Sequence, residues 1–197
     1  MSPLHPSALD QLFVEARTLN HWLPEGISDE LIRQLYELTK LGATTTNSHP
    51  TRFFFVKSHA AKEQLKPALS AGNVDKTMAA PLTVVVAFDP LFHEKMTTLF
   101  PARPQLVAAL GAMPADQREF TLVQNSGLEA GYFMIAARAL GLDCGPMAGF
   151  ERGQVDATVL AGTGWKSVLL INLGYGDRSK LHPRLPRLDF EQACRIA

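Results

Sequence analysis

A long apolar helix constrains this chain more than any other feature of its sequence. Residues 119–140 predict the longest helix, and the second half of that segment is apolar nearly all round. Its most apolar stretch, 128–142, contains Glu129 and Arg138 and is shorter than the roughly 20 residues that a membrane-spanning helix needs. We therefore expect a helix buried at the centre of a soluble domain.

Composition narrows the size of the domain and the nature of its partners. The chain has 197 residues, so we expect a single domain over residues 1–197. Nineteen Lys and Arg balance 19 Asp and Glu, which argues against nucleic acid or an anionic membrane as the main partner. Charged residues make up 19%. This is less than the roughly 25% usual in soluble domains, so we expect apolar surface to meet another subunit.

The cysteines and the N-terminus indicate a cytoplasmic protein. Cys144 and Cys194 are too few for a disulfide-built secreted domain, and no Cys/His cluster suggests a metal site. The first 12 residues lack a cationic start followed by an apolar stretch, so no signal peptide is expected. Cys144 has no adjacent base and is expected to be inert packing.

The order of strands and helices favours an α+β fold. Runs of β-branched and aromatic residues predict strands at 53–56, 82–88 and 167–173. Helical spacing of apolar residues predicts further helices at 7–17, 28–41, 60–68 and 154–160. Strands and helices do not alternate strictly, and no GxGxxG motif opens a strand–helix unit. A doubly wound Rossmann domain is therefore not expected.

The remaining segments are expected to be irregular. Residues 89–118 contain four prolines and predict short helices in a mobile excursion, a natural place for a lid. The polar stretch 70–76 and the Gly/Pro-punctuated stretch 141–149 predict loops. The tail at 174–186 is polar and basic, and its prolines keep it irregular.

Four polar clusters flank these apolar elements, at residues 17–20, 44–50, 72–76 and 180–187. No GxSxG, HExxH or P-loop motif accompanies them. Their hydroxyl, amide and Arg/Lys side chains suit a phosphate joined to a polar heterocycle. Solvated turns are the commoner explanation of any one such cluster, so the residues alone leave both interpretations open.

Four ordered motifs resemble those of the nitroreductase family of FMN-dependent oxidoreductases. They read EARTLNHW, GATTTNSHPTRFFFV, GNVDKTMAAPLTVVV and AARALGLDCGPMAGFE, and the resemblance spans nearly the full chain. It implies a central, mostly antiparallel sheet flanked by helices. It also implies an intertwined homodimer with FMN bound at the interface, touched by both chains, and NADH or NADPH as co-substrate.

The resemblance assigns the FMN phosphate to Arg17 and Thr18, with Arg184 from the C-terminal tail. Asn20 stands where many members of the family have a second basic residue, so phosphate neutralisation would depend more on the tail. Lys180 and Arg187 lie near Arg184 in the sequence and are interpreted as surface charges.

The other three motifs supply the remaining expected flavin contacts. Thr44, Thr45 and Asn47 match the loop that holds the ribityl chain and ring edge, and His49 is interpreted as an orienting group within that loop. Asn73 and Lys76 would face the polar edge of the ring. The turn at Pro146, Met147, Ala148 and Gly149 would act through its backbone, with Ala148 and Gly149 near flavin N5.

Within the family, four segments look like the malonic semialdehyde reductases of pyrimidine degradation. They read EARTLNHW, SAGNVDKT, LGLDCGPMAGF and INLGYGDRSKLHPRLPRLDFEQA. The implied reaction passes hydride from NAD(P)H to FMN, and then from flavin N5 to malonic semialdehyde, giving 3-hydroxypropionate. One alternative is a general nitroreductase or quinone reductase, and another is a non-catalytic flavin-binding dimer. No residue is assigned as the proton donor.

Overall fold

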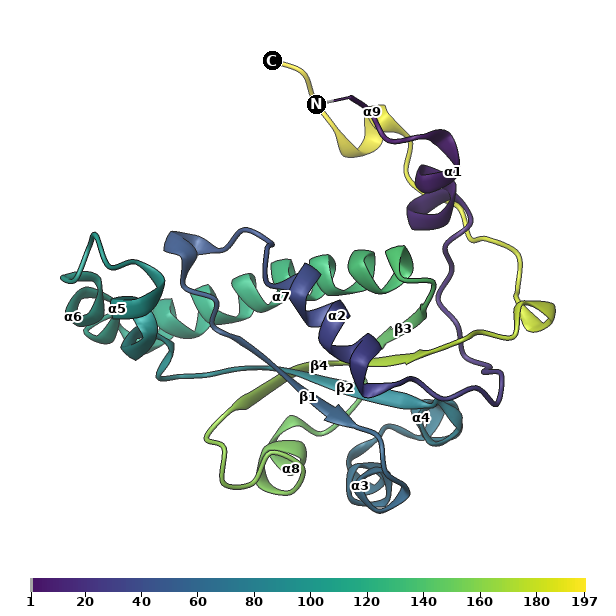
Figure 1. Ribbon diagram of the computed structural model, residues 1–197, viewed down its shortest axis with the longest axis horizontal. Helices are drawn as coiled ribbons and strands as arrows, with labels where there is room; N and C mark the ends of the chain where they lie inside the picture. Colours follow the sequence, from purple (N-terminus) through teal and green to yellow (C-terminus); the bar gives the residue numbers. More distant parts are fainter. Residues whose placement is uncertain (1) are drawn as a thin grey trace.

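Four strands form one antiparallel sheet in the computed structural model, which describes residues 2–197 (Figure 1). In spatial order they are β1 (Thr51–Val56), β2 (Leu82–Phe88), β4 (Lys166–Gly174) and β3 (Asp143–Met147). Each adjacent pair is antiparallel. The expected α+β class and antiparallel central sheet are confirmed, and β2 has the predicted bounds.

Helices cover both faces of the sheet (Figure 1). On one face lie α2 (Asp29–Thr39) and α7 (Ala115–Ala139). On the other lie α3 (His59–Leu65), α4 (Ala71–Ala79) and α8 (Arg152–Ala157). Alternate side chains of β2 enter the two cores: Val84 belongs to the same core as Phe133 of α7, and Val85 to the same core as Leu65 of α3. Because both faces are covered, β2 is apolar along nearly its whole length.

The excursion at residues 89–118 contains short helices, as its prolines predict. They are η4 (Phe92–Lys95), α5 (Met96–Leu99) and α6 (Leu106–Gly111). Phe92, Met96 and Leu110 form a third core with Leu122 of α7 and with Phe88 and Val168 of the sheet. Figure 1 shows this unit at the end of the sheet beside the start of α7.

The expectation that α7 is buried all round is wrong for the single chain. The sheet and α2 cover one face, which carries Phe133 and Ala137. The opposite face leaves Leu128 50% exposed, together with Phe120 and Tyr132. One sheet and one helix cannot enclose a 25-residue helix on every side.

The N- and C-terminal segments project together from the body (Figure 1). The predicted helix at 7–17 is a short α1 (Pro6–Leu9) continued by the π-helical η1 (Asp10–Val14). Its N-cap is His5, whose ring accepts from the Ser7 amide. The tail adds η5 (Arg178–Lys180) and a short α9 (Phe190–Ala193).

Two segments expected to be loops are regular elements. Residues 143–147 pair with β4, and this edge position tolerates Pro146 because an outward-facing amide is not needed there. Residues 71–79 form α4, since Val74 and the fully buried Thr77 have tertiary partners on the sheet side. No helix in the described residues 2–197 is long and apolar enough to cross a membrane.

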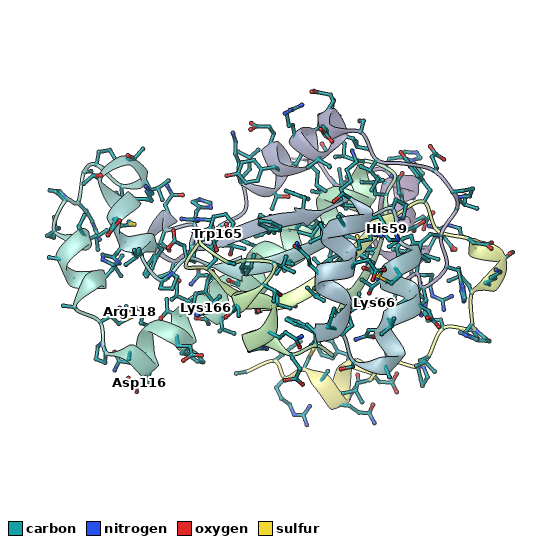
Figure 2. All side chains as sticks on the ribbon, turned by 90° about the horizontal axis from the view of Figure 1, so that it is seen from below. His59, Lys66, Asp116, Arg118, Trp165 and Lys166 are labelled. Atoms are coloured by element: carbon teal, nitrogen blue, oxygen red, sulfur yellow. The ribbon has the colours of Figure 1, made fainter. Side chains whose placement is uncertain are left out.

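A buried lysine ties α3 to the end of α4. The ammonium of Lys62 donates to the Thr77 carbonyl at 3.1 Å and also to the Ala80 carbonyl. Burial lowers the pKa of Lys62 from its ordinary 10.5 to about 8. Lys66, which follows α3, is half exposed and lies on the outer surface (Figure 2).

We expect Lys62→Met to lower the free energy of unfolding by about 1–3 kcal/mol, because these carbonyls lose their donor. Chemical denaturation measures this, and Lys66→Met, which removes a half-exposed cation and its surface pair with Glu63, should change stability by less than about 0.5 kcal/mol. Between pH 8 and 10.5 the folded state binds fewer protons than the unfolded state, so the difference between wild type and Lys62→Met should widen as pH rises. Equal free energies of unfolding for Lys62→Met and Lys66→Met would contradict the stabilising role of Lys62.

Candidate functional site

The first polar cluster lies against the edge strand β3. The Leu19 amide donates to the Cys144 carbonyl at 3.1 Å, which holds residues 17–20 alongside the strand. Gly145 permits this approach, because a Cβ there would lie 2.6 Å from the Leu19 carbonyl oxygen. The sequence thus places Arg17, Thr18 and Asn20 along one line beside the sheet.

A cationic cavity of about 400 Å³ opens beside this segment. Arginines from three parts of the chain line it together with His182: Arg17, Arg138, Arg184 and Arg187. Within the described residues, no carboxylate lines this cavity. Guanidinium groups match phosphate oxygens in geometry and charge, so the cavity suits a phosphate.

The terminal segments fix two of these arginines. Arg17 donates to the His182 carbonyl, and Arg184 donates to the Ala16 carbonyl at 2.9 Å. These bonds tie the tail to the N-terminal segment and hold both guanidinium groups at the cavity. The structure therefore brings together Arg17, Thr18 and Arg184, as the family resemblance implies, and adds Arg187.

Arg138 also lines this cavity, although its sequence context did not make it a candidate. It lies in the last turn of α7 and donates to the Leu12 carbonyl at 2.9 Å. Its Nε is buried and has no hydrogen-bond partner within the described part of the chain. Its position in an otherwise apolar run was the available signal, because a buried charge requires a counter-ion or acceptor.

Two further cavities continue from the cationic one. A small cavity of about 70 Å³ is lined by Arg17, Asn20 and Lys180. The next, of about 460 Å³, is lined by Asn20, Lys76 and Lys180. The three cavities thus follow residues 17–20 from the arginines to α4, and Lys180 contributes to this path rather than to the arginine cluster.

Asn73 and Gly149 are joined by a hydrogen bond. The Asn73 amide donates to the Gly149 carbonyl at 2.7 Å, and a Cβ at Gly149 would lie 2.7 Å from the same amide nitrogen. Pro146 and Ala148 are exposed, whereas Met147 is buried in the core, so Met147 can offer a ligand only its backbone.

The loop that contains Thr44, Thr45 and Asn47 is not part of this path. The backbone amide of Thr45 donates to the side-chain oxygen of Asn125 in α7 at 2.8 Å. The side-chain amide of Asn47 donates to the Leu99 carbonyl of α5 at 2.8 Å. Figure 1 shows this end of the sheet away from α1 and α4. Within one chain, these three residues do not meet Arg17 or Lys76.

This loop has an unusual backbone. The backbone φ angles of Thr46, Asn47 and His49 are 51°, 57° and 38°. These values lie in the left-handed region, which residues other than glycine rarely adopt. Each such residue costs about 1–3 kcal/mol, so the surrounding contacts must hold the loop in place.

Cys144, which lies beside this path, is a buried free thiol. Burial raises the pKa of the Cys144 thiol to about 12, so the thiol stays protonated and inert, as expected. Among residues 2–197, no three His, Cys, Asp or Glu side chains gather into a metal site.

Comparison with known proteins gives the family. The profile of the Nitroreductase family matches residues 15–175, which include the 17–20 segment and all four strands. The chain belongs to the nitroreductase family. A relative from Ralstonia nicotianae is 54% identical over 198 residues, covers all of both chains, and carries the provisional name NADH dehydrogenase/NAD(P)H nitroreductase.

Two solved structures of provisionally named nitroreductases share the fold. One is from Bacillus subtilis, with a TM-score of 0.87, 21% identity, and coverage of 98% of this chain and 100% of that chain. The other, from Exiguobacterium sibiricum, was solved in complex with FMN. It has a TM-score of 0.86, 20% identity and full coverage of both chains.

Proposed function

We propose that this nitroreductase-family protein is an FMN-dependent NAD(P)H oxidoreductase of the cytoplasm. The observation that carries the proposal is the cationic cavity that continues past Asn20 to Lys76. It offers phosphate ligands at one end and polar ring contacts at the other. Two comparisons support the same proposal: the Exiguobacterium sibiricum structure contains FMN, and the name of the Ralstonia relative includes NAD(P)H.

The residues present fit FMN. Arg17, Thr18, Arg138 and Arg184 would bind its phosphate, and the unsatisfied Nε of Arg138 is a donor still available for an oxygen atom. Lys76 and Asn20 would contact the ring, where a lysine stabilises negative charge. The bond from Asn73 to Gly149 would hold the turn whose backbone faces the ring. Bound FMN would supply the hydride transfer between the nicotinamide and the acceptor.

A second copy of the chain would complete this site. Thr44, Thr45 and Asn47 lie apart from the arginine cavity, so they can contact the same flavin only from another subunit. The exposed apolar face of α7 supports an obligate homodimer. The projecting terminal segments support it too, because Phe13, Leu188 and Phe190 are more than half exposed on them.

The acceptor is proposed to be a small aldehyde, malonic semialdehyde, on the strength of the four motifs shared with that branch of the family. The second candidate is a general nitroreductase or quinone reductase, which the name of the Ralstonia relative favours. Both reactions would use the same cofactor residues, so the acceptor must be distinguished by activity.

Steady-state rates decide between the two acceptors. With NADH in excess, kcat/KM for malonic semialdehyde should exceed kcat/KM for a nitroaromatic compound and for a quinone. The reverse order would assign the protein to the general reductases and exclude the aldehyde.

A further inference from the structure

A buried carboxylate and an imidazole meet behind the loop that contains Asn47. Glu129 of α7 is only 3% exposed. One of its oxygens lies 3.1 Å from Nδ1 of His49, and the other accepts from the Thr51 amide at 3.3 Å. This contact faces a cavity of about 320 Å³, distinct from the path described above. No step of the proposed function uses this pair.

The surroundings of His49 determine how many protons its ring carries. The Asn47 amide nitrogen donates to the Leu99 carbonyl, so the Asn47 amide oxygen is the atom facing Nε2 of His49, at 2.9 Å. The ring therefore has an acceptor on each side, Asn47 on one and Glu129 on the other. Both contacts are hydrogen bonds only if the pair holds one proton more than a neutral imidazole and a carboxylate.

The other charged groups near His49 do not replace Glu129 as its counter-ion. Arg52 of β1 donates to the His49 carbonyl at 2.9 Å, but its charge is matched by Asp89 at 2.9 Å. Tyr36 of α2 and Lys40, the residue that follows α2, line the same cavity, and Lys40 pairs with Glu37. Glu129 is thus the one carboxylate in the described chain that bonds the ring.

Loss of the proton would release the loop. A neutral ring that keeps its Nε2 proton for Asn47 presents a lone pair to the buried carboxylate, and the two repel each other. A ring that instead keeps its Nδ1 proton has none to donate to Asn47. In either state one contact is lost, and Asn47 and His49 both hold left-handed backbone conformations that depend on such contacts.

We propose that His49 and Glu129 share one exchangeable proton that positions Asn47, so that this pair couples FMN binding to pH. The inference rests on the proposed function, in which Asn47 faces the flavin from a second copy of the chain. His49 and Glu129 are positioning residues: the proton goes to water as pH rises, and the loop then holds Asn47 less firmly.

The test compares FMN dissociation constants at about pH 6.5 and about pH 9 in wild type and Glu129→Gln. Wild type should bind FMN about tenfold more weakly at the higher pH, the lower end for a charge-assisted hydrogen bond. In Glu129→Gln, the new amide can donate to Nδ1 of a neutral ring and still accept from Thr51. This variant should therefore bind like wild type at the lower pH and change less than about twofold. Titration of the FMN phosphate affects both proteins equally.

Nitrogen NMR of the histidine rings gives a second readout, assigned with His49→Gln. Wild type at the lower pH should show both His49 nitrogens protonated, or one proton shared with Glu129, and Glu129→Gln should show a neutral ring. The same pH dependence of FMN affinity in wild type and Glu129→Gln would overturn the inference. A neutral His49 ring with an ionised Glu129 at the lower pH would also overturn it. If neither protein binds FMN at any pH, the proposed function fails as well.

Discussion

Replacing Arg17 with alanine should weaken FMN binding by roughly 1.5–3 kcal/mol, a 10- to 150-fold rise in the dissociation constant. The physical reason is the loss of a charge-assisted hydrogen bond in a cavity whose lining is cationic and, within the described residues, contains no carboxylate. Arg17→Ala with Arg184→Ala should lose more than either change alone. Titration of the apoprotein with FMN, followed by flavin fluorescence, measures each constant.

Arg33→Ala is the matched control for this prediction. Arg33 lies on α2, its side chain is 72% exposed, and its distance of 3.8 Å to Glu30 makes a weak pair. Its loss removes the same charge from the protein and should leave FMN affinity unchanged. If the double variant Arg17→Ala, Arg184→Ala binds FMN with an unchanged dissociation constant, the phosphate does not bind in this cavity.

A charge on the exposed face of α7 should abolish both assembly and flavin binding. Leu128→Arg places a cation where an obligate interface of more than about 2,000 Å² is proposed. Sedimentation at micromolar protein should show a dimer for wild type and a monomer for the variant. The monomer should release FMN, because the arginine cavity and the loop of Asn47 would no longer meet around one flavin.

Gln64→Arg provides the control for the added charge. Gln64 is an exposed residue of α3, which lies on the opposite face of the sheet from α7 (Figure 1). This variant should remain a dimer and keep its flavin. A Leu128→Arg monomer that retains FMN and NADH oxidation would contradict the shared site, and a wild-type monomer would contradict the dimer itself.

A strand of the sheet could be predicted from the sequence where its own residues are apolar enough to indicate burial. The strand at 82–88 is apolar because both of its faces are covered, and this signal lies within the segment itself. The strand at 143–147 could not be predicted in the same way. Gly145 and Pro146 resemble a turn, and the need for Gly145 arises only when Leu19 packs against it.

Some residues of the candidate site could likewise be predicted from the sequence, and others could not. Motifs in the order of the family predict Arg17, Asn73 and Lys76 as candidates, since each lies within a short characteristic segment. Glu129 lies in no such motif, and Arg138 lies in the fourth without being one of its expected flavin contacts; each acquires partners more than 70 residues away in sequence. Both are charges within an apolar helix, a pattern that predicts buried partners but does not identify them.

We expect this chain to carry FMN and to reduce it with a nicotinamide. The most direct measurement adds NADH, and separately NADPH, to FMN-loaded protein without oxygen and follows the yellow flavin absorption. We expect the absorption to bleach with either or both nucleotides and to return when an acceptor is added. Protein that stays colourless after addition of FMN and gains no thermal stability from it would contradict the account. A bound flavin that neither nucleotide bleaches would contradict it equally.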